Sequence, residues 1–187
     1  GTVRISDEIM AEAHIHVPAE KRGVGLMFQD FALFPHLNVR DNVGFGLTEL
    51  STKAANQRID QLLERVNMLD QGDAFPHILS GGQQQRIALA RALAPKPAVV
   101  LLDEPFSGID PIAVEDIQQI IFDLKRRNIG VLITDHNVRE TLTITDRAYL
   151  LYEGDILKSG SARELTEDEE TRRLYLGRKF KMDFTDG

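Results

Sequence analysis

Apolar and polar residues follow two different periods along the chain, and together these periods predict alternating strands and helices. Uninterrupted apolar runs at 24–28, 99–102 and 129–134 indicate buried strands, and the run at 99–102 is typical of a parallel strand covered on both faces. Elsewhere, apolar residues recur at intervals of three and four, as expected of amphipathic helices. Helices are expected to begin at or after the capping residues Asn38, Ser51 or Thr52, Ser80, Asp110 and Ser161.

The two ends of the chain carry weaker patterns. Residues 147–152 and 155–158 predict a hairpin joined at Glu153-Gly154. Residues 1–22 are polar and weakly patterned, apart from a candidate edge strand at 2–5. Strands that alternate with helices of ten or more residues predict an α/β fold with a mostly parallel sheet.

The composition fits one domain in a reducing compartment. The chain has 187 residues, of which 42% are hydrophobic, and this is enough to build a core. Its net charge of −7 argues against a dedicated nucleic-acid binder, because such proteins usually carry a basic surface. The sequence contains no cysteine, which excludes disulfides and thiolate chemistry. The apolar run 98–102 is too short to cross a membrane and the first residues lack the layout of a signal peptide, so we expect a soluble, cytoplasmic domain.

Two carboxylates, Asp103 and Glu104, directly follow the apolar run 99–102. Ligands of α/β sheets bind at the carboxyl ends of the strands, so these side chains are candidates for a functional site. A carboxylate in this position can hold Mg²⁺ through water, and the adjacent glutamate could polarise a water molecule for attack on a phosphate. A strand end followed by an acidic turn is the alternative interpretation.

The segment 79–86 reads Leu-Ser-Gly-Gly-Gln-Gln-Gln-Arg and precedes this strand. Ser80 and Gln83 form the pattern of a capping box at a helix start. Gly81 and Gly82 let the backbone approach an anion closely, and a helix N-terminus offers unpaired N–H groups with partial positive charge. A capped helix start without a ligand is the alternative. The combination of this segment with a following strand that ends in Asp-Glu-Pro is highly specific.

These segments resemble motifs of the nucleotide-binding domain of ATP-binding cassette (ABC) transporters. Residues 79–86 are similar to the signature motif of that family, and residues 99–104 are similar to its Walker B strand. Three further segments follow the order of the family: 28–30 resembles the Q-loop, 107–110 the D-loop and 134–136 the switch loop with its histidine.

The resemblance covers residues 1–177 and implies a fold. This is a P-loop NTPase-like, mostly parallel sheet with an inserted helical subdomain that carries the signature motif. In a partial ABC ATPase domain at 1–187, the subdomain would occupy about 38–95, and 1–37 and 96–187 would form the remainder of the catalytic core.

Roles around ATP and Mg²⁺ also follow from the resemblance. Asp103 and Gln29 would bind the metal ion, and Gln29 would also touch the attacking water. Glu104 would act as general base, and His136 would contact the γ-phosphate and stabilise its developing charge. Without the resemblance, His136 would be interpreted as a surface histidine and Gln29 as an ordinary polar residue. The residues that would address a nucleotide held by a second subunit are Ser80, Gly81, Gly82, Gln83 and, in the D-loop, Asp110.

Partners are implied in the same way. Family members pair head to tail, so a second ATPase subunit, as in a homodimer, would share each ATP. A transmembrane permease subunit would dock on the loop from Asp30 to Leu37, although Phe31, Phe34 and Leu37 could instead be core residues. The chain would then lie at the inner face of the cell membrane as a peripheral subunit, and no nucleic acid is expected as a ligand.

The sequence departs from the family in two respects. The phosphate loop Gly-x-x-x-x-Gly-Lys-Ser/Thr (Walker A) does not occur in it, so we expect about fifty residues to be absent before Gly1. Weak ATP binding by the chain alone, and a free edge or an uncovered face of the sheet, are then expected. Residues 28–37 resemble iron, polyamine or sugar importer ATPases, whereas 131–142 and 174–177 resemble the lipopolysaccharide-export ATPase and imply a nearly complete C-terminus.

Three functions are therefore compared. The first is an ATP-binding and ATP-hydrolysing subunit that couples hydrolysis to transmembrane transport. The second is a non-catalytic, truncated or chimeric fragment that acts only as a folded or dimerising module. The third, a soluble ABC ATPase of DNA repair, is disfavoured because such proteins insert long coiled coils between Q-loop and signature, and only 51 positions separate Gln29 from Ser80.

Overall fold

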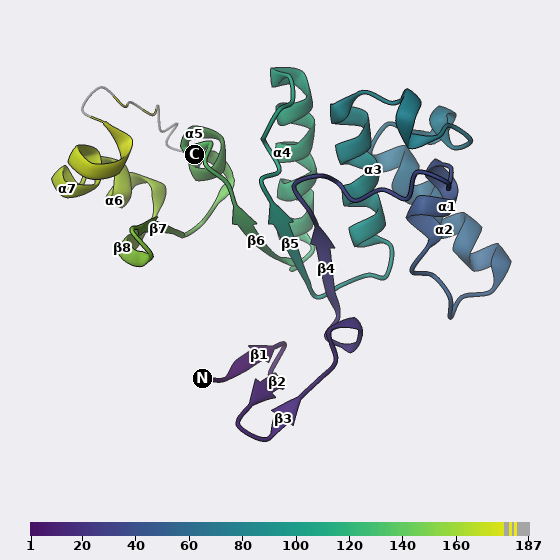
Figure 1. Ribbon diagram of the computed structural model, residues 1–187, viewed down its shortest axis with the longest axis horizontal. Coiled ribbons are helices and arrows are strands. Elements are labelled where there is room, and N and C mark those ends of the chain that lie inside the picture. Colours follow the sequence, from purple (N-terminus) through teal and green to yellow (C-terminus); the bar gives the residue numbers. More distant parts are fainter. Residues whose placement is uncertain (178–179, 181, 183–187) are drawn as a thin grey trace. The chain divides into compact units, whose positions relative to one another are not determined.

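The computed structural model describes residues 1–177, 180 and 182, and the chain divides into two compact units (Figure 1). The first unit is Gly1–Thr134 and the second is Asp135–Gly187. No helix among the described residues is long and apolar enough to cross a membrane.

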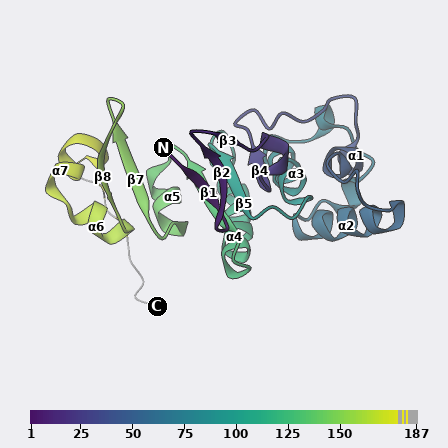
Figure 2. The same ribbon diagram turned by 90° about the horizontal axis from the view of Figure 1, so that it is seen from below.

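The N-terminal unit contains two sheets with different strand directions. A small antiparallel sheet comes first along the chain, with the order β1-β2-β3. A parallel sheet with the order β4-β5-β6 follows (Figure 2). Along the chain, helices of this unit connect each of its strands to the next. The strands are β1 (Val3–Ile5), β2 (Glu8–Glu12), β3 (Ile15–His16), β4 (Val24–Met27), β5 (Val99–Asp103) and β6 (Gly130–Thr134).

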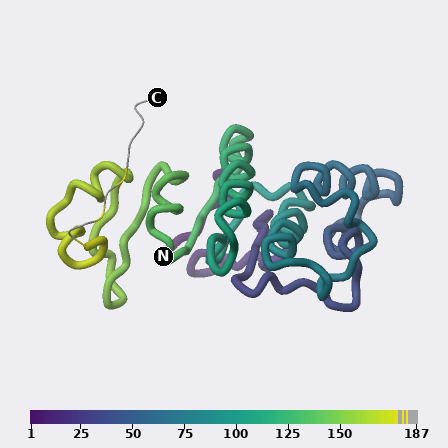
Figure 3. Tube along the Cα trace, turned by 90° about the horizontal axis from the view of Figure 1, so that it is seen from above, coloured from purple at the N-terminus to yellow at the C-terminus, as the bar shows by residue number. Residues whose placement is uncertain are grey.

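Each main helix of this unit begins at the residue that the sequence predicts. The side chains of Asn38, Ser51, Ser80 and Asp110 each accept a hydrogen bond from the first turn and so satisfy backbone N–H groups that have no partner in the helix. In the trace of Figure 3, α1, α2 and α3 form one group, and α4 follows as a separate helix. The helices are α1 (Val39–Gly44), α2 (Thr52–Arg65), α3 (Gly81–Leu93) and α4 (Pro111–Arg126), with short turns η1 (Ala19–Lys21), η2 (Leu69–Gln71) and η3 (Pro76–Ile78).

The core of the N-terminal unit lies on one face of the parallel sheet. Met27, Val100 and Leu102 are buried on this face, together with the apolar sides of α3 and α4. A Cβ atom at Gly25 would lie only 2.4 Å from the carbonyl oxygen of Ala92, so a glycine is needed where β4 passes the end of α3. The sheet and the signature-like helix are therefore in direct contact.

The opposite face of this sheet is open. Leu26, Leu101 and Leu132 lie beside one another in the strand register, and Leu26 and Leu132 are 41% and 57% exposed. The expectation that the strand at 99–102 is covered on both faces is therefore wrong within the N-terminal unit, whose described residues leave this side of the sheet exposed. An uncovered face was one of the two arrangements expected, the other being a free edge of the sheet.

The C-terminal unit is built around a hairpin. Tyr152 pairs with Asp155, so the turn consists of Glu153 and Gly154, both with positive φ as a two-residue turn requires. Leu142, Leu150 and Leu165 form its buried apolar cluster. The elements are α5 (Val138–Ile144), β7 (Ala148–Tyr152), β8 (Asp155–Gly160), α6 (Ala162–Glu167), α7 (Glu169–Thr171) and η4 (Arg172–Leu176).

Candidate functional site

The carboxyl end of the parallel sheet brings Asp103 and Thr134 together. They are the last residues of β5 and β6 and pair directly in the register. The hydroxyl of Thr134 donates a 2.6 Å hydrogen bond to Oδ1 of Asp103. No hydrogen bond to Oδ2 of Asp103 is found within the described part of the chain, so this oxygen remains available for a ligand.

Glu104 takes up an unusual backbone conformation directly after β5. Its φ is +47°, in the left-handed region, which costs a residue with a side chain about 1–2 kcal/mol. The N–H of Glu104 donates to the carbonyl of Thr134 at 2.7 Å, and its own carbonyl accepts from Ser107 at 3.2 Å. These bonds hold the sharp turn that directs the chain away from the sheet after Asp103.

Gln29 joins this group from the neighbouring strand. It lies two residues beyond the end of β4, and its Nε2 donates a hydrogen bond to Oε2 of Glu104 at 3.3 Å. The structure thus brings together Gln29 and Glu104, two of the predicted catalytic residues, at the same edge of the sheet as Asp103.

The tip of α3 forms the predicted capping box. Oγ of Ser80 accepts from the N–H of Gln83 at 3.3 Å, and Oε1 of Gln83 accepts from the N–H of Ser80 at 2.9 Å. Ser80 is exposed, so its hydroxyl is open to solvent. The side-chain carbonyl of Gln83 is already used within the helix tip.

The two glycines of this tip have different surroundings. A Cβ atom at Gly82 would lie 3.0 Å from Cβ of Ala113, so Gly82 permits close packing of α3 on α4. A Cβ atom at Gly81 would meet nothing within 4 Å. Packing within the chain therefore accounts for Gly82 but gives no reason for Gly81.

Asp110 lies at the start of α4, close to this tip. Its Oδ1 accepts hydrogen bonds from Ile112 and Ala113, both at 3.0 Å, so the side chain caps α4. Arg86 of α3 and Asp116 of α4 form an ion pair at 3.4 Å. The two helix N-termini are thus held together near Gly82.

The sequence interpretation missed Gln85, which ties α3 to the turn after Glu104. Its side chain is fully buried, and its Nε2 donates to the carbonyl of Pro105. The signal was its position: Gln85 lies on the same helix side as Ala88 and Ala92, three and seven residues later, which are buried.

Two other residues that the sequence interpretation missed hold the loop at 28–37. Arg91 of α3 donates to the carbonyls of Phe31 and Ala32 at 2.8 and 2.6 Å, and its guanidinium lies 5.4 Å from the ring centroid of Phe34. Phe31 and Ala32 both have positive φ. Asn42 is fully buried, and its side chain bonds both the N–H and the carbonyl of Phe34.

His136 belongs to the C-terminal unit and is described there. It follows β6 by two residues, its side chain is 66% exposed, and its Nδ1 lies 3.9 Å from Oδ1 of Asp135. Oδ1 of the buried Asp135 side chain also accepts from the N–H of Asn137 at 2.7 Å. His136 therefore sits in a loop that Asp135 organises.

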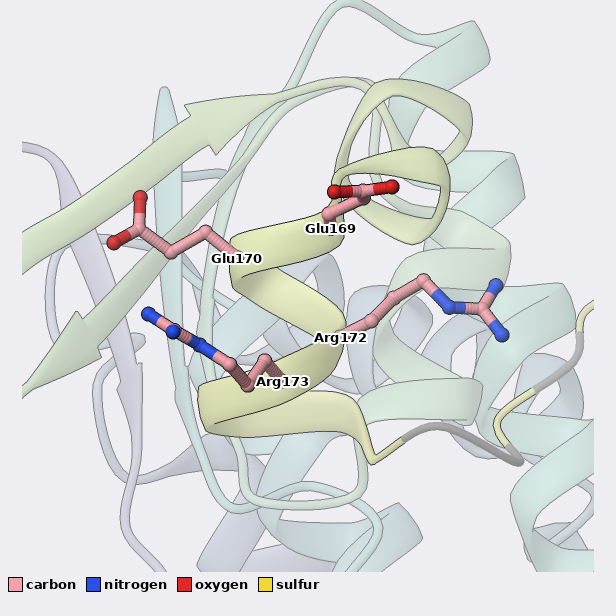
Figure 4. Close-up of a pocket in the computed structure, with 4 residues that line it drawn as sticks. All are labelled: Glu169, Glu170, Arg172 and Arg173. Carbon is pink, nitrogen blue, oxygen red and sulfur yellow. The ribbon is translucent and has the colours of Figure 1, made fainter.

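A cavity of about 510 Å³ in the same unit contains none of the predicted site residues. Glu169, Glu170, Arg172 and Arg173 of α7 and η4 line it. In Figure 4, Glu170 and Arg173 extend to one side of this helical segment and Arg172 extends to the other.

The side-chain oxygens at the ends of the strands are suitable ligands for Mg²⁺, and the N-terminal tip of α3 is suitable for a phosphate. Magnesium is usually bound by one or two carboxylates, with water and phosphate oxygens completing its shell. Asp103 offers a carboxylate oxygen, and Gln29 offers an amide oxygen. Among the described residues, no three His, Cys, Asp or Glu side chains form a metal cluster. The capped tip at Ser80 and Gly81 is an exposed helix N-terminus, where phosphate oxygens are favoured.

A parallel sheet with carboxylates at its strand ends and an exposed, glycine-rich helix tip defines the class of α/β ATPase domains. Comparison with known proteins gives the family. The family model described as ABC transporter matches residues 1–107. The chain is 41% identical to the lipopolysaccharide export system ATP-binding protein LptB of Haemophilus influenzae, over 97% of this chain and 76% of that protein. It is 46% identical to a probable ABC transporter ATP-binding protein of Azorhizobium caulinodans, over 86% of this chain and 58% of that protein. The chain therefore belongs to the ABC transporter family, as an ATP-binding, ATP-hydrolysing subunit.

Solved structures agree with this assignment. CbiO1 of Clostridium perfringens, described as part of the ABC transporter complex CbiONQ, has a TM-score of 0.76 and 26% identity, over 90% of this chain and 68% of that chain. The ATP-binding cassette MJ0796, solved as a dimer bound to ADP and Pi, also has a TM-score of 0.76, with 27% identity over 87% of this chain and 74% of that chain. The predicted α/β fold class is thereby confirmed.

Proposed function

We propose that this subunit uses the sheet edge formed by Gln29, Asp103 and Glu104 to hydrolyse ATP, and that hydrolysis is coupled to transmembrane transport. The observation that carries the proposal is the hydrogen bond between Gln29 and Glu104. A general base must lie within hydrogen-bond reach of the water that it activates, and a glutamine beside it can orient that water. Glu104 is the base in this assignment, and Gln29 positions the water.

Asp103 and Gln29 would hold Mg²⁺, which supplies positive charge for the phosphates when it is bound. Thr134 fixes the Asp103 carboxylate by its 2.6 Å hydrogen bond. This bond sets which carboxylate oxygen faces the site, as a supporting hydrogen bond does at metal sites in general.

The tip of α3 would bind the phosphates of a nucleotide on a second subunit in a head-to-tail dimer. Gly81 supports this assignment, because no atom of the described residues outside its own helical turn lies within 4 Å of a Cβ atom placed there. Ser80 would donate its hydroxyl, and Gly81 and Gly82 would offer backbone N–H groups. Gln83 would act by shaping this tip through the capping box. Asp110 would support the interface from the start of α4.

His136 would contact the γ-phosphate. Its exposed side chain and its place in the loop organised by Asp135 support this role, because a histidine donor can stabilise charge that develops on a phosphate oxygen.

The loop from Asp30 to Leu37 is the surface that we assign to the permease subunit. Arg91 and Asn42 hold its backbone, while Pro35 and His36 are exposed, so the loop offers a firm surface to a partner. In this interpretation, residues at about 38–95 form the helical subdomain, and the subunit lies at the cytoplasmic face of the membrane. The similarity to LptB of Haemophilus influenzae favours lipopolysaccharide as the cargo.

Replacing the proposed base tests this function directly. In the full-length protein, Glu104→Gln is expected to retain ATP binding and to lower kcat at least about a hundredfold, the usual contribution of a general base. Glu115→Gln, an exposed glutamate on α4, is the matched control and is expected to leave kcat unchanged. Equal turnover in the two variants would remove Glu104 from the mechanism. Absence of turnover in the unmodified full-length protein would favour a non-catalytic module.

A further inference from the structure

A second cavity, of about 320 Å³, lies in the N-terminal unit at the opposite end of the parallel sheet from Asp103. It is formed by α2, by the carboxyl ends of α3 and α4, and by the residues that lead into β5 and β6. Parallel strands start at this edge, whereas the candidate ATP site is at the edge where they end. The lining combines an apolar wall, which includes Leu62 and Leu93, with four cationic side chains: Arg58, Arg65, Lys96 and Arg127.

Among the residues that the structure describes, no carboxylate lines this cavity. Within the described part of the chain, none of the four side chains takes part in an ion pair. The half-buried position of Arg58 lowers the pKa of its guanidinium by desolvation, and the nearby charges of Arg65 and Arg127 lower it further. Such a concentration of like charge is unexpected in a chain whose net charge is −7.

Capping of helix C-termini explains one of these residues. Arg58 donates to the carbonyls of Leu93 and Ala94 at 2.7 and 3.2 Å and so satisfies the end of α3. Among the described contacts, the side chains of Arg65, Lys96 and Arg127 make no hydrogen bond to a carbonyl of the chain. Three exposed cationic groups thus face a cavity whose described lining supplies no carboxylate. The pKa of Asp123, which lies outside the lining, is lowered mainly by its hydrogen bond with Arg126 and also by the charge of Arg127.

We propose that this cavity binds a small organic phosphate with an apolar part. Its volume is at the lower end of the range for ligand pockets, about 300–1,000 Å³. The apolar wall would take the hydrocarbon part of the ligand, and Arg65, Lys96 and Arg127 would neutralise its dianionic group. Arginine is well suited to this because its planar guanidinium donates to two phosphate oxygens at once. The proposal does not depend on the assignment of the ATP site.

Phenyl phosphate is a suitable probe, because it joins a dianion to an apolar ring. Its binding to the full chain is measured by isothermal titration calorimetry. Benzyl alcohol is the comparison ligand without charge, and inorganic phosphate is the comparison ligand without an apolar part. The double variant Arg65→Gln/Arg127→Gln removes two charges but leaves Arg58 and the end of α3 intact. The matched control is Arg126→Gln, a neighbouring arginine that pairs with Asp123 outside the cavity.

Phenyl phosphate is expected to bind at least tenfold more weakly to the double variant than to the unmodified chain, with no change in Arg126→Gln. Inorganic phosphate is expected to bind at least tenfold more weakly than phenyl phosphate, and benzyl alcohol not measurably. Equal affinity in the double variant, or an equal loss in Arg126→Gln, would overturn the site. Equal affinity for inorganic phosphate would overturn the apolar part of the proposal. If the double variant does not fold, as judged by circular dichroism, Arg127→Gln alone replaces it, with a threefold weakening expected and no weakening overturning the site.

Discussion

The side-chain amide of Gln29 donates a 3.3 Å hydrogen bond to the carboxylate of Glu104, although 75 positions separate the two residues in the chain. The parallel pairing of β4 with β5 makes this contact, because it places the ends of both strands at the same edge. A carboxylate that accepts a hydrogen bond from an amide N–H is held in one orientation. The two side chains should therefore act as a unit.

The first prediction concerns this pair. Gln29→Ala is expected to lower kcat for ATP hydrolysis about tenfold to a hundredfold in the full-length protein, because Glu104 loses its orienting partner. The KM for ATP should change less than kcat, since Asp103 remains to hold Mg²⁺ whereas the reacting water loses the residue that positions it. Both constants are measured by steady-state kinetics. The control is Gln57→Ala, at an exposed glutamine on α2. A rise in KM with unchanged kcat would show that Gln29 contributes to binding only.

The second prediction separates the two glycines of the helix tip. Gly82→Ala should lower stability by about 1–3 kcal/mol, because its new methyl group would press on Ala113. Gly81→Ala should leave stability unchanged or raise it by up to about 1 kcal/mol, because alanine is the better helix former and the space is open.

Chemical denaturation and ATPase assays of these two variants are compared side by side. Gly81→Ala is expected to lower turnover in spite of its normal stability, because the methyl group occupies the space assigned to a phosphate. Normal turnover in Gly81→Ala would indicate that no ligand approaches this position.

The third prediction concerns Arg91. Arg91→Ala removes two hydrogen bonds to the carbonyls of Phe31 and Ala32 and should cost about 2 kcal/mol, as expected for bonds from a charged donor. Amide hydrogen exchange should become faster at 31–37 and stay unchanged in β5. Arg91→Lys should restore only part of the protection, because one ammonium group cannot reproduce the paired guanidinium bonds. Full protection in Arg91→Ala would mean that Asn42 alone holds the loop.

The fourth prediction concerns pH. The Asp168 carboxylate accepts hydrogen bonds from Lys158, at 2.7 Å, and from the N–H of Thr171. These two hydrogen bonds lower the pKa of Asp168 from 3.8 to about 2. Because the folded state favours the ionised carboxylate, its stabilising contribution is complete above about pH 5 and is lost as the pH falls towards 2. Asp168→Asn should therefore destabilise the C-terminal unit at pH 7 and have a decreasing effect below pH 4.

Tyrosine fluorescence during thermal unfolding measures this effect, because the three tyrosines of the chain, Tyr149, Tyr152 and Tyr175, all belong to the C-terminal unit. Asp155→Asn, in the hairpin of the same unit, is the control for removal of a carboxylate. A destabilisation by Asp168→Asn that is equal at pH 3 and pH 7 would contradict the assignment.

Local signals in the sequence are sufficient for most of the helices and strands. Ser51, Ser80 and Asp110 were recognised as caps because capping depends on a side chain and the three residues that follow it. The hairpin turn at Glu153-Gly154 is equally local. The sheet β1-β2-β3 was missed, apart from its first strand, because its short strands are mostly exposed and carry almost no apolar alternation.

The candidate site was predicted only as far as its residues occur in recognisable motifs. Asp103 and Glu104 follow an apolar run, and Gln29 was identified by resemblance, but the bond from Thr134 to Asp103 depends on the strand register. Gln85 was missed because a polar residue is usually assigned to the exposed side of a helix, although its position three and seven residues before Ala88 and Ala92 indicated the buried side.

Helix α3 has its glycine-rich tip at one end and the Arg91 contacts near the other, and it contains 13 residues. At 1.5 Å per residue, these ends are about 20 Å apart and are joined by a continuous, stiff hydrogen-bonded rod. If an incoming phosphate tilted the N-terminal tip, the helix would therefore tilt as a rigid body. The backbone around Phe31, which Arg91 contacts, would move with it, without any change in the hydrogen bonds within the helix.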